Sequence, residues 1–378
     1  MKNYSIVLGS FFGDEGKGQC VNNLCNSLDK DSTCVLRFSG GPQVGHNVSH
    51  NGIQHCFSNY GSGTLLDIPT YWSDYCLVDP FTAILEKDIL LSKGITPNII
   101  YSPMCEIITP FDVWNQWNNN ENRKHGTVGV GIKSTLDRIK NGYHLKLMDA
   151  LNLCVLREKI KSIQDNYYKI SENLPTAKFS IDVWVLKVNE FIKNIELLLP
   201  ETIFKRYDNI IFEGSQGILL DQTFGVMPWC TPSNTTSKNA VELIKNYSQL
   251  PLANVKVYYV CRPYITRHGN GPLLTTSKVL DVEDKNNTYN EYQKSFRSCE
   301  FDINLLNHSL YIDSFNFKEK HEKNIVFSHA SELSSELKNK ICNLIYYLTK
   351  CEKNQTLHLN SHSSSTSART NNSTDVST

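Results

Sequence analysis

The stretch "YSIVLGSFFGDEGKGQ", residues 4–19, runs from an apolar segment into a turn with four glycines, two acids and one lysine. An apolar run that ends in glycines and continues into "CVNNL" predicts a strand, a tight turn and a helix whose N-terminus offers N–H groups to an anion. The common phosphate-loop spacing is not present, because Phe11 stands at its first glycine and Gly18 at its metal-binding hydroxyl. We predict a phosphate loop of another kind. The alternative is a glycine-rich turn whose acids cap a helix.

The composition favours an enzyme that acts on small molecules. The 378 residues are 40% hydrophobic and 20% charged with no net charge, which argues against nucleic-acid and membrane-surface partners. No apolar run approaches the roughly 20 residues that span a bilayer, and the opening residues lead directly into the first strand, so we expect a cytoplasmic protein. The 12 cysteines form no C-x-x-C pair, which favours reduced thiols over disulfides or a zinc site.

Apolar, β-branched runs alternate with helical patterns along the chain. This alternation predicts an α/β fold with a mainly parallel central sheet. The expected strands lie in residues 4–9, 33–40, 75–80, 99–104, 209–214, 255–263, 324–329 and 356–361. Apolar faces at helical spacing occupy residues 81–94, 183–199 and 336–350. We expect one domain over residues 1–365 with a helical insertion at about 150–205, and a disordered Ser/Thr/Asn-rich tail at 366–378.

Three further glycine-rich clusters follow predicted strands: "RFSGGPQVGHNVSHNG" (37–52), "FEGSQGILLDQTFGVMPWCTPSNTT" (212–236) and "TRHGNGP" (266–272). Loops at neighbouring strand ends share one cleft in open α/β sheets, so His46 is expected to face Asp14 as a general acid opposite a general base. A loop histidine that bonds only backbone is the alternative for His46. Ordinary turn chemistry is the alternative for the later clusters.

Together these motifs resemble the adenylosuccinate synthetase family over residues 4–360. The similarity lies in "GDEGKG", the glycines and "VGH" of residues 40–46, "GTVGVGI", "FEGSQGILLD", "TPSNTT" and "TRHGNGP", in the family's order and spacing. The resemblance implies a carbon–nitrogen ligase of purine biosynthesis. In that reaction a nucleoside triphosphate phosphorylates the 6-oxygen of IMP, and the amine of L-aspartate then displaces the phosphate.

The resemblance also implies roles for the first two clusters. Asp14 would take the proton from purine N1, His46 would act as general acid toward the 6-oxygen, and Lys17 would hold the transferred phosphoryl group. Mg²⁺ would be bound by Asp14 and the carbonyl of Gly45. The triphosphate would be bound by Gly13, Glu15, Gly16, Gly18, Gly45 and His46.

The acceptor nucleotide would be bound by residues of several loops. They are Gln43, which stands where the family usually has asparagine, with Thr127, Gln216 and Thr231. The family also uses an arginine from the partner subunit, for which "STLDRIKNG" offers Arg138 or Lys140, one residue short of the usual spacing. A homodimer is therefore expected.

Two segments depart from the family pattern. The arginine-rich amino-acid loop is replaced by "NEYQKSFRSCEFD" (290–302), where Arg297 is the sole arginine. We assign Arg297 and Ser295 to a carboxylate of aspartate, with a solvated surface arginine as the alternative. Ser331 stands at or near the aspartate that reads guanine in the triphosphate, and Ser361 is the other donor-base assignment. Loss of that carboxylate predicts that ATP serves at least as well as GTP.

Two other functions stay open at this point. A phage branch of the family uses dGMP as acceptor and ATP as donor, and this sequence shares its short length and altered loop. Retention of Asp14 favours IMP, because a smaller residue there would make room for a purine 2-amino group. A regulatory nucleotide-binding module without turnover is the alternative from another class.

Overall fold

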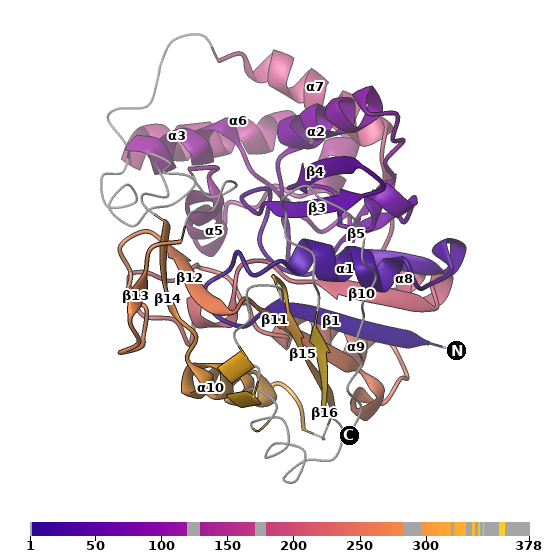
Figure 1. Cartoon of the computed structure of the whole chain (residues 1–378). Coiled ribbons are helices and arrows are strands. Elements are labelled where there is room, and N and C mark those ends of the chain that lie inside the picture. Colours follow the sequence, from indigo (N-terminus) through magenta and orange to yellow (C-terminus); the bar gives the residue numbers. More distant parts are fainter. Residues whose placement is uncertain are drawn as a thin grey trace.

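A parallel sheet of nine strands runs through the molecule in the order β16-β15-β11-β1-β10-β2-β5-β7-β9 (Figure 1). Every neighbouring pair in this sheet is parallel, so the predicted α/β fold is confirmed. The computed structural model describes residues 2–118, 129–170, 179–282, 296–318, 321–329, 335–336, 339–340, 343 and 355–359. The strands are β1 (Asn3–Gly9), β2 (Thr33–Arg37), β5 (Thr70–Trp72), β7 (Ile99–Tyr101), β9 (Glu196–Leu197), β10 (Asn209–Glu213), β11 (Lys256–Cys261), β15 (Glu322–Phe327) and β16 (Gln355–Leu359).

Side chains of the central strands alternate between two buried faces. On β1, Tyr4, Ile6 and Leu8 pack into one apolar core and Val7 into another. Burial on both faces explains why this strand reads as a nearly continuous apolar run. The first face is covered by α8 (Pro200–Arg206), α9 (Lys238–Tyr247) and α10 (Ile303–Ser314), and the second by α1 (Lys17–Cys25).

The strand predictions need two corrections on the β2 side of the sheet. The run at residues 75–80 forms β6 (Leu77–Val78), which pairs with β8 (Glu106–Ile107) in a separate small sheet. The central sheet instead contains β5, whose three residues are too short a run to show a strand pattern. The glycine-rich cluster at residues 37–52, expected to be a loop after a strand, is also only partly a loop, because β3 (His46–His50) and β4 (Ile53–Phe57) form a hairpin. Its turn residues, Asn51 and Gly52, both have positive φ, as a type I′ hairpin turn requires.

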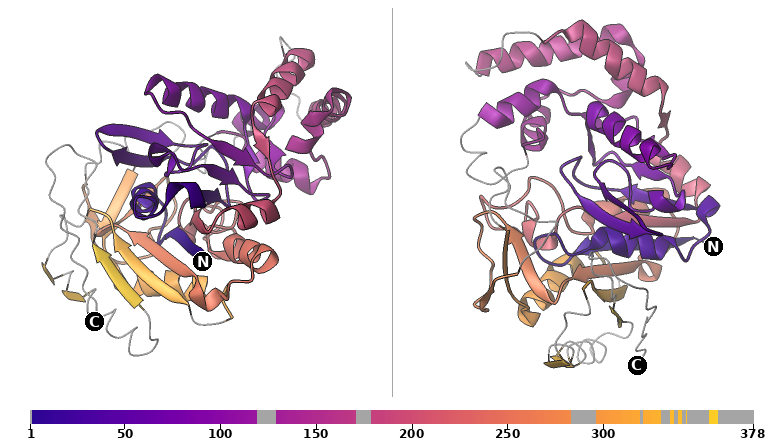
Figure 2. Two further views of the ribbon diagram at one scale, coloured as in Figure 1. Left: turned by 90° about the vertical axis from the view of Figure 1, so that its right-hand side faces the viewer. Right: turned by 45° about the horizontal axis from the view of Figure 1, so that its top comes forward.

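The helical part of the chain stands at the opposite end of the molecule from β16 (Figures 1 and 2). On α6, Leu156, Ile160, Ile163 and Tyr167 are buried at steps of three and four residues, as the helical period requires. The segment at about 150–205, expected to be a helical insertion, also contains the short strand β9, which lies at one edge of the sheet. The helices here are α2 (Pro80–Ser92), α3 (Pro110–Asn118), α5 (Ile132–Lys140), α6 (Leu153–Ile170) and α7 (Ile181–Lys193).

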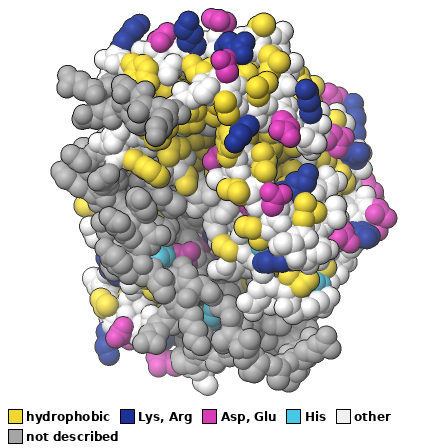
Figure 3. All heavy atoms as spheres, turned by 90° about the horizontal axis from the view of Figure 1, so that it is seen from above, with side chains coloured by type: hydrophobic (Ala, Val, Ile, Leu, Met, Phe, Trp, Pro, Cys, Tyr) yellow, Lys and Arg dark blue, Asp and Glu magenta, His cyan; other side chains and the backbone are white. Residues whose placement is uncertain are grey.

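The surface of this helical end carries many hydrophobic side chains (Figure 3). Leu85 and Ile89 of α2 and Val183 and Leu186 of α7 are each about half exposed or more. Among the helices of the described residues, none combines the length and the apolar character needed to cross a bilayer.

A separate three-stranded antiparallel sheet lies beside the carboxyl ends of the central strands. It consists of β12 (Tyr264–His268), β13 (Val279–Leu280) and β14 (Phe296–Glu300). Thr266 on β12 donates to the carbonyl of Gly13 at 3.1 Å, so this sheet is tied directly to the loop after β1.

Candidate active site

The loops that follow β1, β2, β10 and β12 surround a cavity of about 230 Å³. This is the edge of an open parallel sheet at which ligands bind. Eight residues predicted from the sequence line this cavity: Gly13, Asp14, Lys17, Gln43, Gly45, His46, Gln216 and Thr231.

Other predicted site residues either do not line this cavity or fall outside the residues that the structure describes. Glu15, Gly16 and Gly18 belong to the same loop and helix as Asp14 but do not line the cavity. Lys140 is exposed at the end of α5. Thr127, Ser295, Ser331 and Ser361 lie outside the described residues.

The loop after β1 separates its two acids. Glu15 is buried, accepts a hydrogen bond from the Phe11 amide at 2.6 Å and forms an ion pair with Lys17 Nζ at 3.5 Å. Burial raises the pKa of Glu15, against the opposing field of Lys17. Asp14, in contrast, has a positive φ of 60° and lines the cavity. Glu15 therefore stabilises the conformation of the loop. Asp14 is the acid that a ligand in the cavity can contact.

Asp14 has a histidine partner that the sequence analysis did not find. His268 Nε2 lies 3.2 Å from Asp14 Oδ2, and both residues line the cavity. Burial favours the neutral acid, but the hydrogen bond and charge of His268, with the charges of Arg262 and Lys17, hold the pKa of Asp14 below its usual value. Asp14 is therefore a carboxylate acceptor at neutral pH.

His46 is held by a buried glutamate. Its Nδ1 lies 2.7 Å from Glu213 Oε1, and Ser62 donates to the same carboxylate through its amide at 3.1 Å and through its hydroxyl. Burial opposes ionisation of Glu213, but His46 and Arg37 lower its pKa to about 2. An ionised carboxylate only accepts hydrogen bonds, so Nδ1 carries the proton.

The second ring nitrogen of His46 is left for a ligand. Nε2 is buried and has no hydrogen-bond partner among the described residues, while the residue lines the cavity. Burial lowers the pKa of His46 although Glu213 opposes this, so a proton held on Nε2 is given up readily. This arrangement, in which a carboxylate orients a histidine, is typical of general acid–base catalysis.

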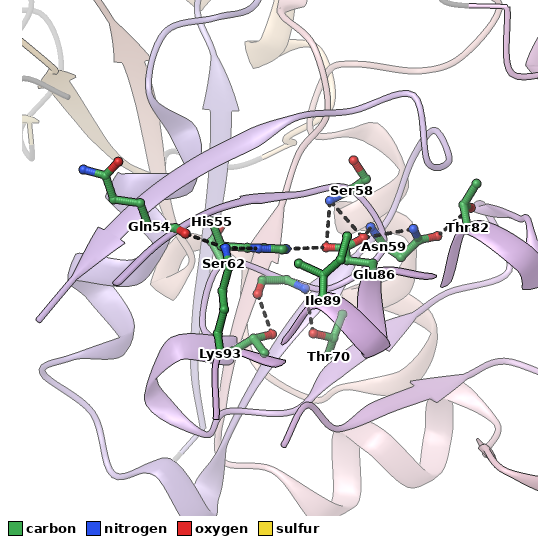
Figure 4. Close-up of polar contacts among 12 residues, drawn as sticks. Gln54, His55, Ser58, Asn59, Ser62, Thr70, Thr82, Glu86, Ile89 and Lys93 are labelled. Atoms are coloured by element: carbon green, nitrogen blue, oxygen red, sulfur yellow. Dashed lines mark hydrogen bonds and ion pairs between the residues drawn. The ribbon is translucent and has the colours of Figure 1, made fainter. Parts of the chain in front are cut away.

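The loop that presents Ser62 is anchored by a second buried glutamate (Figure 4). Glu86 of α2 accepts from the amides of Ser58 and Asn59 and from the Asn59 side chain, at 2.6–3.3 Å. His55 contacts Glu86 through Nε2 at 3.3 Å and accepts from Lys93 through Nδ1 at 3.1 Å. This network fixes the loop whose Ser62 supports Glu213.

The first two glycine-rich turns pack against each other. A Cβ on Gly18 would lie 2.9 Å from His46 Cβ and 3.0 Å from Ser62 Oγ. Only glycine lets the first turn of α1 approach β3 this closely. The structure thus brings Asp14, Lys17 and His46 to one cavity.

The loop after β10 forms another wall of the cavity. A Cβ on Gly217 would lie 2.4 Å from the Phe11 carbonyl oxygen, so this loop packs directly against the first one. Asp221 accepts from the amides of Thr223 and Thr235 and so orders the segment that carries Thr231. The side-chain amide of Gln43 and the side-chain oxygen Oε1 of Gln216 are buried and have no hydrogen-bond partner among the described residues.

Two arginines stand side by side where β12 meets β14. Arg267 and Arg297 are paired across the strands, and Arg267 is 3% exposed. Arg267 donates to the carbonyls of Trp229 and Pro272 and stacks 4.2 Å from the centre of the Phe12 ring. Burial, with the charge of Arg297, lowers the pKa of Arg267 to about 10. Neither guanidinium forms an ion pair with an acid among the described residues.

The segment 132–140 offers a different cation from those expected. Arg138 is buried, where it pairs with Asp112 at 2.9 Å and donates to the Ile107 carbonyl, so it is part of its own subunit's core and does not reach a partner. Lys133, in the first turn of α5, lines the cavity. Lys133 lies seven residues before Lys140, about 10 Å along the helix axis.

The site residues that sequence reasoning missed are Glu213, His268, Arg267 and Lys133. The first three lie inside the quoted motifs "FEGSQG" and "TRHGNGP", but their partners come from distant segments. The donor set also fits magnesium, because Asp14 and the Gly45 carbonyl provide oxygen ligands. No group of three or more His, Cys, Asp or Glu side chains in the described part of the chain is arranged to hold a metal ion, and magnesium bound through phosphates does not need one.

Comparisons with known proteins identify the family to which the chain is similar. The family model described as adenylosuccinate synthetase matches residues 6–355. Adenylosuccinate synthetase 1 of Photorhabdus laumondii is 25% identical, over 82% of this chain and 75% of its own length. The adenylosuccinate synthetase of Natronomonas pharaonis is 26% identical, over 74% of this chain and 65% of its own length. The chain therefore spans about two thirds to three quarters of these two relatives.

Two solved structures share the fold, each with a TM-score of 0.67. Fully ligated adenylosuccinate synthetase from Plasmodium falciparum is 18% identical, and the match covers 86% of this chain and 76% of that one. Cyanophage S-2L succinoaminodeoxyadenylate synthetase, bound to dGMP and dATP, is 14% identical, and the match covers 96% of this chain and 93% of that one.

Proposed function

Since the chain belongs to the adenylosuccinate synthetase family, whose members are carbon–nitrogen ligases that use a nucleoside triphosphate, we propose that it joins L-aspartate to C6 of a 6-oxopurine nucleotide. IMP is the proposed acceptor. The observation that carries this proposal is the convergence of Asp14, Lys17 and His46 on one cavity.

Each of these three side chains has a chemical role in the proposed reaction. Asp14 takes the N1 proton of the purine, so that the 6-oxygen becomes a nucleophile toward the γ-phosphorus. His46, when protonated on both ring nitrogens, donates from Nε2 to that oxygen, and Lys17 stabilises charge on the transferred phosphoryl group. The 6-oxygen attacks the γ-phosphorus, the bond from that phosphorus to the β–γ bridging oxygen breaks, and the nucleoside diphosphate leaves. The amine of aspartate then attacks C6 and loses its proton, the C6–O bond breaks, and inorganic phosphate leaves.

Members of the family generally need Mg²⁺. In this chain the carboxylate of Asp14 and the carbonyl oxygen of Gly45 would hold it. When bound, the ion offsets the negative charge of the phosphates. The loop amides of residues 13–18 support the triphosphate beside Lys17, with Gly16 as the N-cap of α1.

The acceptor nucleotide is assigned to the walls formed by Gln43, Gln216 and Thr231. Their buried amide and hydroxyl groups suit a base edge and a phosphate. Thr127 and a partner-subunit Lys140 remain proposals for the phosphate.

Aspartate is assigned to the two neighbouring arginines. A pair of guanidinium groups without an acidic partner among the described residues is suited to a carboxylate. Arg267 is the additional residue, beside the predicted Arg297 and Ser295. Ser331 and Ser361 remain the proposed contacts to the donor base, with ATP used at least as well as GTP.

An acceptor panel tests this function. IMP, GMP and dGMP are incubated with aspartate, Mg²⁺ and either ATP or GTP, and the N6-succinyl product and phosphate are measured. Product with IMP supports the proposal. Nucleotide binding without turnover would favour a regulatory module, and a strong preference for GTP would contradict the donor assignment. Asp14→Asn and His46→Asn should abolish turnover while nucleotide still binds.

The second candidate is the same chemistry with dGMP as acceptor and ATP as donor. The observation that favours it is the extent of the structural match, which covers 93% of the phage enzyme but 76% of the Plasmodium one. Product from dGMP but not from IMP would select this candidate.

A further inference from the structure

The pairing of His268 with Asp14 determines which hydrogen bonds a purine can make in the cavity. His268 Nε2 is 3.2 Å from Asp14 Oδ2, so one carboxylate oxygen already accepts from the protein. The other oxygen, Oδ1, keeps its lone pairs for a ligand.

His268 is fixed in this position by its surroundings. It is the last residue of β12, pairs with Phe296 across β14, and lies with its ring centre 5.2 Å from that of Phe296. Two residues before it, the Thr266 hydroxyl donates a hydrogen bond to the carbonyl oxygen of Gly13, the neighbour of Asp14 in the loop after β1. The side chain of His268 is 15% exposed. The imidazole is therefore part of the wall, held from two sides.

The two candidate acceptors present different edges to Asp14. Hypoxanthine has a single donor here, the N1–H. Guanine has two neighbouring donors, N1–H and the 2-amino group, which match the two oxygens of one carboxylate in the way that a guanidinium fork does. To accept both, Asp14 needs both oxygens accessible from the ligand side.

We propose that His268 is a specificity-determining residue that makes the site select 6-oxopurine nucleotides without a 2-amino group. By bonding Oδ2 of Asp14, it leaves one oxygen for N1–H and occupies the place beside the second oxygen. A 2-amino group then loses its acceptor and meets the imidazole, and a buried donor without a partner is costly. This inference rests on the proposed ligase function.

The test compares acceptor preference in the wild type and in His268→Ala. The ratio of kcat/KM for IMP to that for GMP, and likewise for dGMP, is measured with ATP, aspartate and Mg²⁺. We expect the wild type to prefer IMP. In His268→Ala the ratio should fall about tenfold, mainly because kcat/KM for the guanine nucleotides rises. His268→Gln restores an N–H donor near Oδ2 and should recover part of the preference.

Controls separate specificity from folding. His308→Ala removes an exposed histidine of α10 and should leave the ratio unchanged. If His268→Ala turns over too slowly, the dissociation constants of IMP and GMP are measured for the wild type and the variant, and their ratio should change in the same direction. A wild-type preference for guanine nucleotides, or an unchanged ratio in His268→Ala, would overturn the inference. Absence of product with every acceptor would instead refute the proposed ligase function.

Discussion

Gly18 is a residue at which a methyl group should disturb the site. In an open helix, Gly→Ala usually stabilises a protein by about 0.5–1 kcal/mol. Here the new Cβ would lie 2.9 Å from His46 Cβ, an atom that cannot move away without its ring. We predict that Gly18→Ala lowers the free energy of unfolding by about 1–3 kcal/mol in urea titrations and lowers kcat. Asn307→Ala, on the exposed side of α10, is the control and should show no loss.

Glu213 should link activity to acid stability. Its pKa is lowered from an ordinary 4.5 to about 2 in the folded chain, so its contribution is fully present above pH 4.5 and is lost as the pH falls from 4.5 to 2. We predict that Glu213→Gln makes the unfolding free energy less dependent on pH in this window. The variant should also lose at least about 100-fold in turnover, because His46 loses its orienting anion.

The surface variant Glu158→Gln on α6 is the control for this experiment and should match the wild type in both measurements. A Glu213→Gln protein with wild-type turnover would show that the carboxylate does not orient His46.

Single site residues could be predicted from the sequence where they lie in a motif. They could not be predicted where their role depends on a contact with a distant segment. Asp14, Lys17 and His46 stand in glycine-rich stretches, and the structure brings them to one cavity. His268 also lies in a quoted motif, but its importance depends on a contact with Asp14 across more than 250 residues. No local pattern indicates such a contact, because register between segments is set by tertiary packing.

Among elements, the loop of residues 58–62 depends on α2 for its shape. Glu86 is buried and accepts hydrogen bonds from two amides of this loop and from one side chain. We predict that Glu86→Gln, which keeps the volume but exchanges one acceptor oxygen for a donor, destabilises the fold by about 1–3 kcal/mol in thermal unfolding. It should also reduce kcat more than it raises KM for the triphosphate.

Asp88→Asn changes an exposed acid on the same helix and should be neutral in both respects. Equal effects of the two variants would contradict the anchoring role of Glu86.

Elements were predictable where burial is complete and the run is long. The five-residue run of β10 is buried from Ile210 to Glu213, and its apolar letters predict a strand. β5, in the central sheet, has three residues. β6, which was predicted to lie in the central sheet, has two. For such short runs the choice of sheet is decided by neighbouring strands, which the local sequence does not describe.

At the scale of the whole molecule, the exposed apolar side chains of α2 and α7 bear on assembly. Leu85 is 62% exposed and Leu186 is 59% exposed, and clusters of this kind mark contact surfaces. We predict a homodimer, so sedimentation equilibrium should give twice the chain mass of 43.0 kDa. The double variant Leu85→Lys and Leu186→Lys should sediment as a folded monomer. A wild type that stays monomeric at micromolar concentration would refute the dimer.

The adjacent guanidinium groups of Arg267 and Arg297 have opposite effects on the stability of the sheet and on the proposed binding of aspartate. Like charges placed directly opposite each other across two strands weaken a sheet, and here no neighbouring acid among the described residues relieves them. An exchange of Arg297 for methionine would give a more stable protein that binds the proposed aspartate substrate poorly. Selection for ruggedness and selection for turnover would therefore pull this position in opposite directions, and a heat-adapted relative would have to find its extra robustness elsewhere.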